Sequence, residues 1–131
     1  MTTFTCNALS VVASDMARTL EFYRLCGFDL PDTPDEAHVE TEVAGGFRIM
    51  FDTVDTVRSF DPGWQPPTGG HRVALAVLCE SPADVDAAYE RVVSAGFAGH
   101  LAPFDAFWGQ RYAVVHDPDG TPVDLYAPLP G

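Results

Sequence analysis

The sequence of 131 residues contains no lysine, and its 7 basic side chains are outnumbered by 19 aspartates and glutamates. Without lysine, the chain cannot carry out Schiff-base chemistry through a side-chain amine. The formal net charge of −12 argues against nucleic acids and anionic membranes as partners, because both call for a basic protein surface. This acidity suits a cationic small ligand, although plain solubility is the simpler explanation.

Cysteine and long apolar runs are also scarce. Cys6, Cys26 and Cys79 form no C-x-x-C pair and are odd in number, so we expect free thiols and no disulfide framework. No apolar run approaches the ~18–20 residues of a membrane span. The residues after Met1 show no basic segment followed by an apolar core, which a signal peptide would have. These absences predict a cytoplasmic protein.

Two amphipathic helices are predicted at corresponding places in the two halves of the chain. The first follows Ser14 or Asp15, runs over residues 16–26 and ends at Gly27. The second starts with Ser81 as N-cap and Pro82 at the first helical position, and it ends at Gly96. Each helix is followed by Gly-Phe, about half the chain length apart. We interpret this as an internal repeat.

Short β-like runs surround both helices, and a turn-rich interval separates the halves. The runs cover residues 9–13, 37–43, 47–52, 73–78, 112–116 and 123–126. Residues 53–70 contain several prolines and glycines and are predicted to be a loop and linker. The economical interpretation is one α+β domain, 1–131, made of two βαβββ modules. The first module covers 1–58 and the second 71–131, with a linker loop at 59–70.

The alternation of strand residues sorts them onto two faces. One face is apolar and is expected to carry the helices: Leu9, Val11, Ile49, Phe51, Val73, Leu75, Val77, Val123 and Leu125. The opposite face mixes small and charged residues: Ala8, Ser10, Arg48, Met50, Asp52, Arg72, Ala74, Ala76, Asp124 and Tyr126. Small side chains leave room for a ligand there, and plain exposure to solvent is an equal interpretation.

The last part of the chain reads as a hairpin around Asp117-Pro118-Asp119-Gly120. Together with other stretches, it resembles the vicinal oxygen chelate superfamily, which includes glyoxalase I, extradiol dioxygenases and bleomycin-resistance proteins. The matching stretches are Val11 to Asp15, Glu21-Phe22-Tyr23, Gly27-Phe28, Trp108-Gly109-x-Arg111 and the Asp-Pro-Asp-Gly turn. The resemblance implies paired βαβββ modules whose mixed sheet curls into a cup, with the helices on its outer face.

In metal-dependent members of that superfamily, positions inside the cup supply His, Gln or Glu ligands. The corresponding residues of this chain are Ala8, Met50, Arg72 and Asp124. Only Asp124 could bind a metal ion well, and catalytic metal sites need about three protein ligands. We therefore expect no metal, no cofactor and no catalytic residue.

Two enzyme alternatives stay open at this point. A one-residue shift in register would turn His71 inward, where it could join Asp124, and His116 in principle, in a metal-dependent lyase, isomerase or dioxygenase. An acid–base enzyme without metal could use Asp124, Asp52 or His116.

The aromatic residues suggest ligand binding, because comparable rings in antibiotic-binding relatives stack on planar groups of the drug. The alternative is that Phe104 and Phe107 fill the core and Trp64 pins its loop. The prediction is a homodimeric, metal-free protein that sequesters a planar or cationic small molecule in an aromatic-lined cup near the subunit boundary. The predicted ligand contacts are Trp108, Trp64, Phe107, Phe104, Phe60, Met50, Arg48, Arg72, Asp124 and Tyr126.

Overall fold

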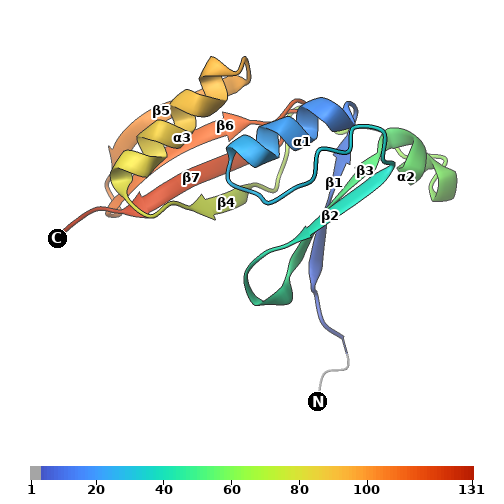
Figure 1. Cartoon of the computed structure of the whole chain (residues 1–131), viewed down its shortest axis with the longest axis horizontal. Coiled ribbons are helices and arrows are strands. Elements are labelled where there is room, and N and C mark those ends of the chain that lie inside the picture. The colour runs from blue at the N-terminus through green and yellow to red at the C-terminus, as the bar shows by residue number, and fades with distance from the viewer. Residues whose placement is uncertain (1–3) are drawn as a thin grey trace.

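The computed structural model describes residues 4–131 and contains two small sheets, with the helices that follow their opening strands on one side (Figure 1). In chain order the elements are β1 (Ala8–Ala13), α1 (Met16–Leu25), β2 (His38–Glu42), the short 3-10 turn η1 (Ala44–Gly46), β3 (Arg48–Thr53), α2 (Val54–Phe60), β4 (Leu75–Leu78), α3 (Pro82–Ser94), β5 (Ala98–Ala106), β6 (Gln110–His116) and β7 (Pro122–Pro128). The α+β class is confirmed.

The two sheets repeat one topology with different numbers of strands. The first has the order β1-β3-β2 and the second β4-β7-β6-β5, and in both the opening strand pairs in parallel with the last strand of its half. The repeat is therefore real, but the described first half has one strand fewer than predicted. Residues 29–36 form no strand. Pro31 and Pro34, which lack the N–H that a strand ladder uses, account for this.

The predicted helix boundaries are confirmed by their caps. The Asp15 side chain accepts a hydrogen bond from the backbone N–H of Arg18 at the start of α1. Ser81 caps the start of α3, where its hydroxyl accepts from the Asp84 N–H and donates to the Asp84 carboxylate. These short-range pairs fix where each helix begins.

The interval 53–70 differs from its prediction, because its first part is helical. Thr53 caps α2 by accepting a hydrogen bond from the Thr56 N–H at 3.2 Å. The prolines and glycines that suggested a loop begin only at Pro62, after α2 has ended. The loop expectation is therefore wrong for Val54–Phe60. Residues 61–70 form neither helix nor strand.

The core lies between the helices and the apolar faces of the strands. Side chains of α1 and α3 pack on the inner residues of β3, β6 and β7, and the largest fully buried ones are Tyr23, Phe22, Phe51, Leu20 and Leu125. Val73 is the exception to the predicted apolar face. It is 59% exposed because β4 begins only at Leu75.

Polar contacts join the two halves at one buried point. The Tyr23 hydroxyl in α1 donates to the Asp117 carboxylate at 2.8 Å, in the turn between β6 and β7. Asp117 also accepts the backbone N–H groups of Asp119 and Thr121. Burial and Asp117 raise the pKa of Tyr23 far above its usual value, so the phenol stays a donor. Arg91 adds a link from α3 to the Leu25 carbonyl.

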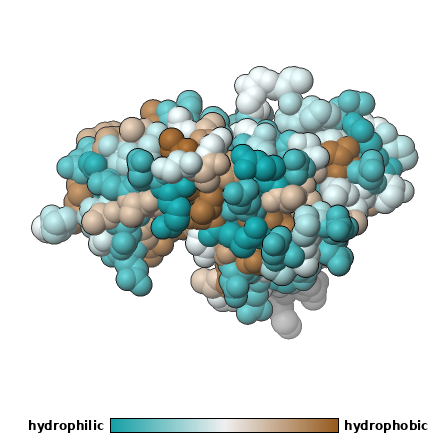
Figure 2. Space-filling model, turned by 45° about the horizontal axis from the view of Figure 1, so that its top comes forward, coloured by the Kyte–Doolittle hydropathy of each residue, from teal (hydrophilic) through white to brown (hydrophobic). Residues whose placement is uncertain are grey.

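The helix-bearing side is largely a solvent surface. Figure 2, turned so that the top of Figure 1 comes forward, shows hydrophilic side chains over much of it, with small apolar patches between them. Among residues 4–131, no helix is long and apolar enough to cross a membrane. The faces of the sheets away from the helices carry the chemistry described next.

Candidate functional site

The helix-free face of the first sheet carries a chain of charged side chains. We call it the charged face, and it consists of His38, Glu40, Arg48 and Asp52 around Met50. His38 Nδ1 lies 2.6 Å from an Asp52 oxygen, and its Nε2 lies 2.8 Å from a Glu40 oxygen. Arg48 donates to the other Glu40 oxygen at 2.8 Å. The network follows from the register, which places His38 directly opposite Asp52.

This arrangement favours the protonated form of His38. Hydrogen bonds to Glu40 and Asp52 raise its pKa above the usual value, since each ring nitrogen can donate to a carboxylate only when both carry a proton. His38 and Arg48 in turn lower the pKa of Glu40. The groups of the charged face pair with one another, so none of them is left as a free acid or base.

The corresponding face of the second sheet carries a row of aromatic rings. We call it the aromatic face, and it consists of Phe104, Phe107, Trp108, Tyr112 and Tyr126. Trp108 contacts Phe107 and Tyr112 edge-to-face, with ring centroids 5.0 and 5.2 Å apart, and Tyr112 continues the row to Tyr126 at 6.3 Å. Phe107 is 97% and Trp108 49% exposed. The row is therefore a surface open to a planar partner rather than core.

Asp124 lies within this aromatic face. Its carboxylate accepts a hydrogen bond from the Tyr112 hydroxyl. Partial burial and this bond raise the pKa of Tyr112 to about 12, so the phenol remains protonated and donates. The face thus combines exposed π-surfaces with one carboxylate, a combination that attracts planar cations.

The positions that supply metal ligands in the resembling superfamily do not fit a metal ion here. The Ala8 side chain has no donor atom, and Met50, which lies among the residues of the charged face, offers only a thioether. Arg72 is exposed and precedes β4, so it does not lie on the sheet face where it was predicted. The remaining ligand, Asp124, already accepts a hydrogen bond from Tyr112.

His71 and His116, the histidines of the two enzyme alternatives, contact groups other than the Asp124 carboxylate. His71 pairs with the Asp119 carbonyl at 3.2 Å. His116 stacks on His100 at 4.5 Å, and burial, with His100 as a second cause, lowers its pKa. Residues 4–131 contain no group of three or more His, Cys, Asp or Glu side chains that could hold a metal ion. Asp52, the further acid–base candidate, is bound to His38.

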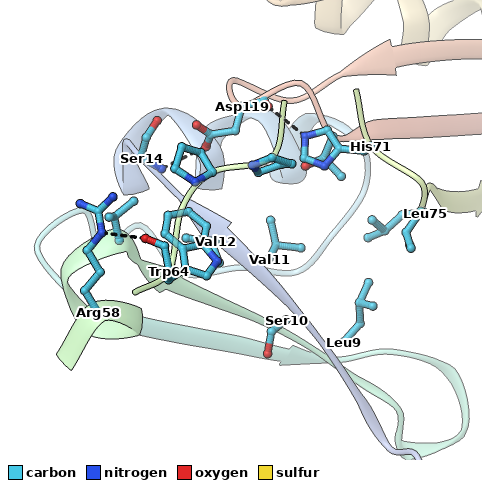
Figure 3. Close-up of a pocket in the computed structure, with 15 residues that line it drawn as sticks. Leu9, Ser10, Val11, Val12, Ser14, Arg58, Trp64, His71, Leu75 and Asp119 are labelled. Atoms are coloured by element: carbon cyan, nitrogen blue, oxygen red, sulfur yellow. Dashed lines mark hydrogen bonds between the residues drawn. The ribbon is translucent and has the colours of Figure 1, made fainter. Parts of the chain in front are cut away.

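Trp64 belongs to a different part of the molecule. It lines a pocket of about 510 Å³ between β1 and residues 64–75, which we call the Trp64 pocket (Figure 3). The structure therefore divides the predicted ligand contacts. Phe60 ends α2 and is 75% exposed, Arg48 and Met50 lie on the charged face, and the remaining aromatic residues lie on the aromatic face.

Sequence reasoning missed several polar residues at these sites. Tyr112, His38 and Glu40 were not singled out, although alternation along β6 and β2 would have placed them on the helix-free faces. The available signal was register: Tyr112 lies directly opposite Tyr126, and His38 opposite Asp52. Arg58 of the Trp64 pocket gave no signal, because it was assigned to a loop.

Comparison with known proteins gives a consistent result. The family model described as the glyoxalase/bleomycin resistance protein/dioxygenase superfamily matches residues 5–125. Uncharacterized protein Mb0911c of Mycobacterium bovis is 30% identical over 127 residues, which cover 91% of this chain and 80% of that protein. Uncharacterized protein Rv0887c of Mycobacterium tuberculosis is also 30% identical over 127 residues, covering 91% of this chain and 72% of its own length.

Solved structures share the architecture. A glyoxalase/bleomycin resistance protein/dioxygenase from Nocardioides superposes with a TM-score of 0.74 at 25% identity, covering 100% of this chain and 87% of that one. A family enzyme from Burkholderia phytofirmans PsJN gives a TM-score of 0.78 at 18% identity, with 94% and 98% of the chains covered. The second likeness concerns the fold alone.

Proposed function

Because the chain belongs to the glyoxalase/bleomycin resistance protein/dioxygenase superfamily, we propose that it is a metal-free binding protein that sequesters a planar, cationic organic molecule. The observation that carries this proposal is the row of exposed rings from Phe107 to Tyr126 with Asp124 beside Tyr112. Rings of this kind offer a large rigid contact area at low entropic cost.

Charge supports a cation as the ligand. The protein carries a formal net charge of −12, which raises the local concentration of cations around it. On the aromatic face Asp124 has no cationic partner among the described residues. A planar cation stacked on Trp108 or Tyr112 would meet both the ring quadrupoles and this carboxylate.

The chemistry of the family ligand positions supports binding without a metal. Three of these positions are occupied by Ala8, Met50 and Arg72, and Arg72 lies off the sheet face. A methyl group, a thioether and a guanidinium do not hold a divalent ion. Sequestration needs no acid, base or nucleophile, which suits a charged face whose groups are already paired.

We further propose that the working form is a homodimer in the cytoplasm, with the ligand close to the subunit boundary. β1 and β4 are edge strands of their sheets, and Val73 and Leu78 beside or within β4 are 59% and 64% exposed. A second copy would cover these edges and wall off the open aromatic face. Cys6, Cys26 and Cys79 are free, which suits a reducing compartment.

Fluorescence of a single-tryptophan protein tests the proposal. In Trp64→Phe, Trp108 is the sole indole, so we expect the planar cation proflavine to quench it in a saturable way after chelator treatment. The neutral tricyclic compound fluorene should bind more weakly, and Phe107→Ala should lower the affinity for proflavine. Absence of saturable quenching at millimolar proflavine, or quenching that requires added metal, would overturn the proposal.

A further inference from the structure

We infer that the Trp64 pocket is a second binding site, separate from the aromatic face, and that its ligand is a small aromatic carboxylate. The pocket lies between the two halves, where residues 9–12 of β1 approach the segment that leads into β4. Its volume of about 510 Å³ falls within the range of small-molecule sites. None of the five aromatic-face residues lines it.

The walls of the pocket suit a flat, apolar ring. Val11 and Leu75, both buried, form part of the lining together with Leu9 and Val12. Trp64 lies across this apolar surface, and Figure 3 shows its indole beside Val12. A planar ring placed between the indole and the valine side chains would bury its apolar surface against both.

Arg58 supplies the charge that selects an anion. Its Nε donates to the Trp64 carbonyl at 3.3 Å, and its guanidinium carbon lies 5.6 Å from the centre of the indole ring. The terminal amino groups of Arg58 have no hydrogen-bond partner among the described residues. By contrast, Arg48 and Arg111 are held by carboxylates. In so acidic a chain, an exposed arginine that lines a pocket and has no carboxylate partner points to a carboxylate from outside.

The other polar groups are mostly able to donate. Ser10 and Ser14 line the pocket, and their hydroxyls have no hydrogen-bond partner among residues 4–131. The one acidic group, Asp119, accepts the Ser14 N–H at 3.0 Å and lies with His71, whose ring pairs with the Asp119 carbonyl. Figure 3 shows this pair on a different side of the pocket from Arg58. The ligand's acceptor group would therefore lie at Arg58 and its ring would extend along β1.

The test uses Trp108→Phe, in which Trp64 is the sole indole, and three probes of one shape. These are 4-nitrobenzoate, its neutral analogue 4-nitrobenzamide, and the cation 4-nitrobenzylammonium, all of which quench indole fluorescence on contact. We expect saturable quenching by the carboxylate, with an affinity at least about tenfold higher than that of the amide, as one charge-assisted hydrogen bond supplies.

A second change isolates the arginine. Arg58→Gln in the same background should remove the preference for carboxylate over amide. Arg24→Gln, at a half-buried arginine outside the pocket, should leave it intact. Thermal melting verifies that both variants fold. Equal binding of amide and carboxylate, tighter binding of the ammonium probe, or an unchanged preference in Arg58→Gln would each overturn the inference. None of these outcomes bears on proflavine binding at Trp108.

Discussion

Trp64 and Trp108 carry the same indole ring, but their neighbours differ in charge. Trp108 continues into a row of rings that contains Asp124, whereas Trp64 lies beside Arg58 in a pocket between the halves. The sequence suggested one aromatic-lined site for both. An aromatic residue therefore marks a surface for planar molecules, and the charged group next to it selects which molecule binds.

The largest effect should come from removing the buried hydrogen bond between Tyr23 and Asp117, which joins the two halves of the chain. Asp117→Ala would leave the buried Tyr23 hydroxyl and two backbone N–H groups without their acceptor. We expect the free energy of unfolding to fall by about 2–4 kcal/mol. Urea denaturation measures this, with the exposed Asp35→Ala as a control that should change little.

The same variant should separate the two sites. Asp119 and Thr121 of the disturbed turn line the Trp64 pocket, so binding of 4-nitrobenzoate should weaken more than binding of proflavine. If both ligands lose affinity equally in a protein that is still folded, the two sites are not independent.

Replacing each tryptophan in turn tests which indole binds proflavine. Trp108→Ala should weaken proflavine binding by about 1–3 kcal/mol, the usual loss for a stacking partner at the centre of a site. Trp64→Ala should leave proflavine binding nearly unchanged. Calorimetric titration of both variants is the measurement, and a larger loss in Trp64→Ala would reverse the assignment.

The charge of the aromatic face is tested at Asp124. Asp124→Asn keeps the shape of the side chain and an acceptor for Tyr112 but removes the negative charge. We expect proflavine binding to weaken by about 1 kcal/mol, less at high salt, because the carboxylate is only partly buried. An unchanged affinity would show that the rings alone bind the ligand.

For the charged face we expect a smaller, pH-dependent effect on stability. The folded state raises the pKa of His38, so its contribution to stability is complete below the ordinary histidine pKa of about 6.5 and is lost as pH rises through the folded pKa. His38→Gln should flatten this slope in thermal melts recorded across that window. Proflavine binding should keep its own pH profile, since His38 lies on the other sheet.

How far the sequence predicts this molecule depends on how local each signal is. Ser81 was predicted as a cap, and Asp15 as one of two candidates with Ser14, because each cap depends on residues three positions apart. Val73 was predicted to lie on the apolar face but is exposed, because the alternation of residues does not show where β4 begins. The helix α2 was missed because prolines just beyond it dominated the composition of the interval.

The candidate sites were less predictable for the same reason. The bond between Tyr112 and Asp124 and the pairing of His38 with Asp52 join residues on neighbouring strands, so they depend on register. The placement of Trp64 beside Arg58 depends on where the segment after α2 folds back. Residue types near the ligand could be inferred, but not which of them share a site.

Metal-free binding of a planar cation is best tested by a crystal structure of the protein with proflavine, with anomalous scattering recorded for transition metals. We expect proflavine density against Trp108 and Tyr112, within reach of Asp124, and no anomalous peak near Met50 or Asp124. A metal ion bound by Asp124 at full occupancy, or proflavine bound in the Trp64 pocket with the aromatic face empty, would contradict it.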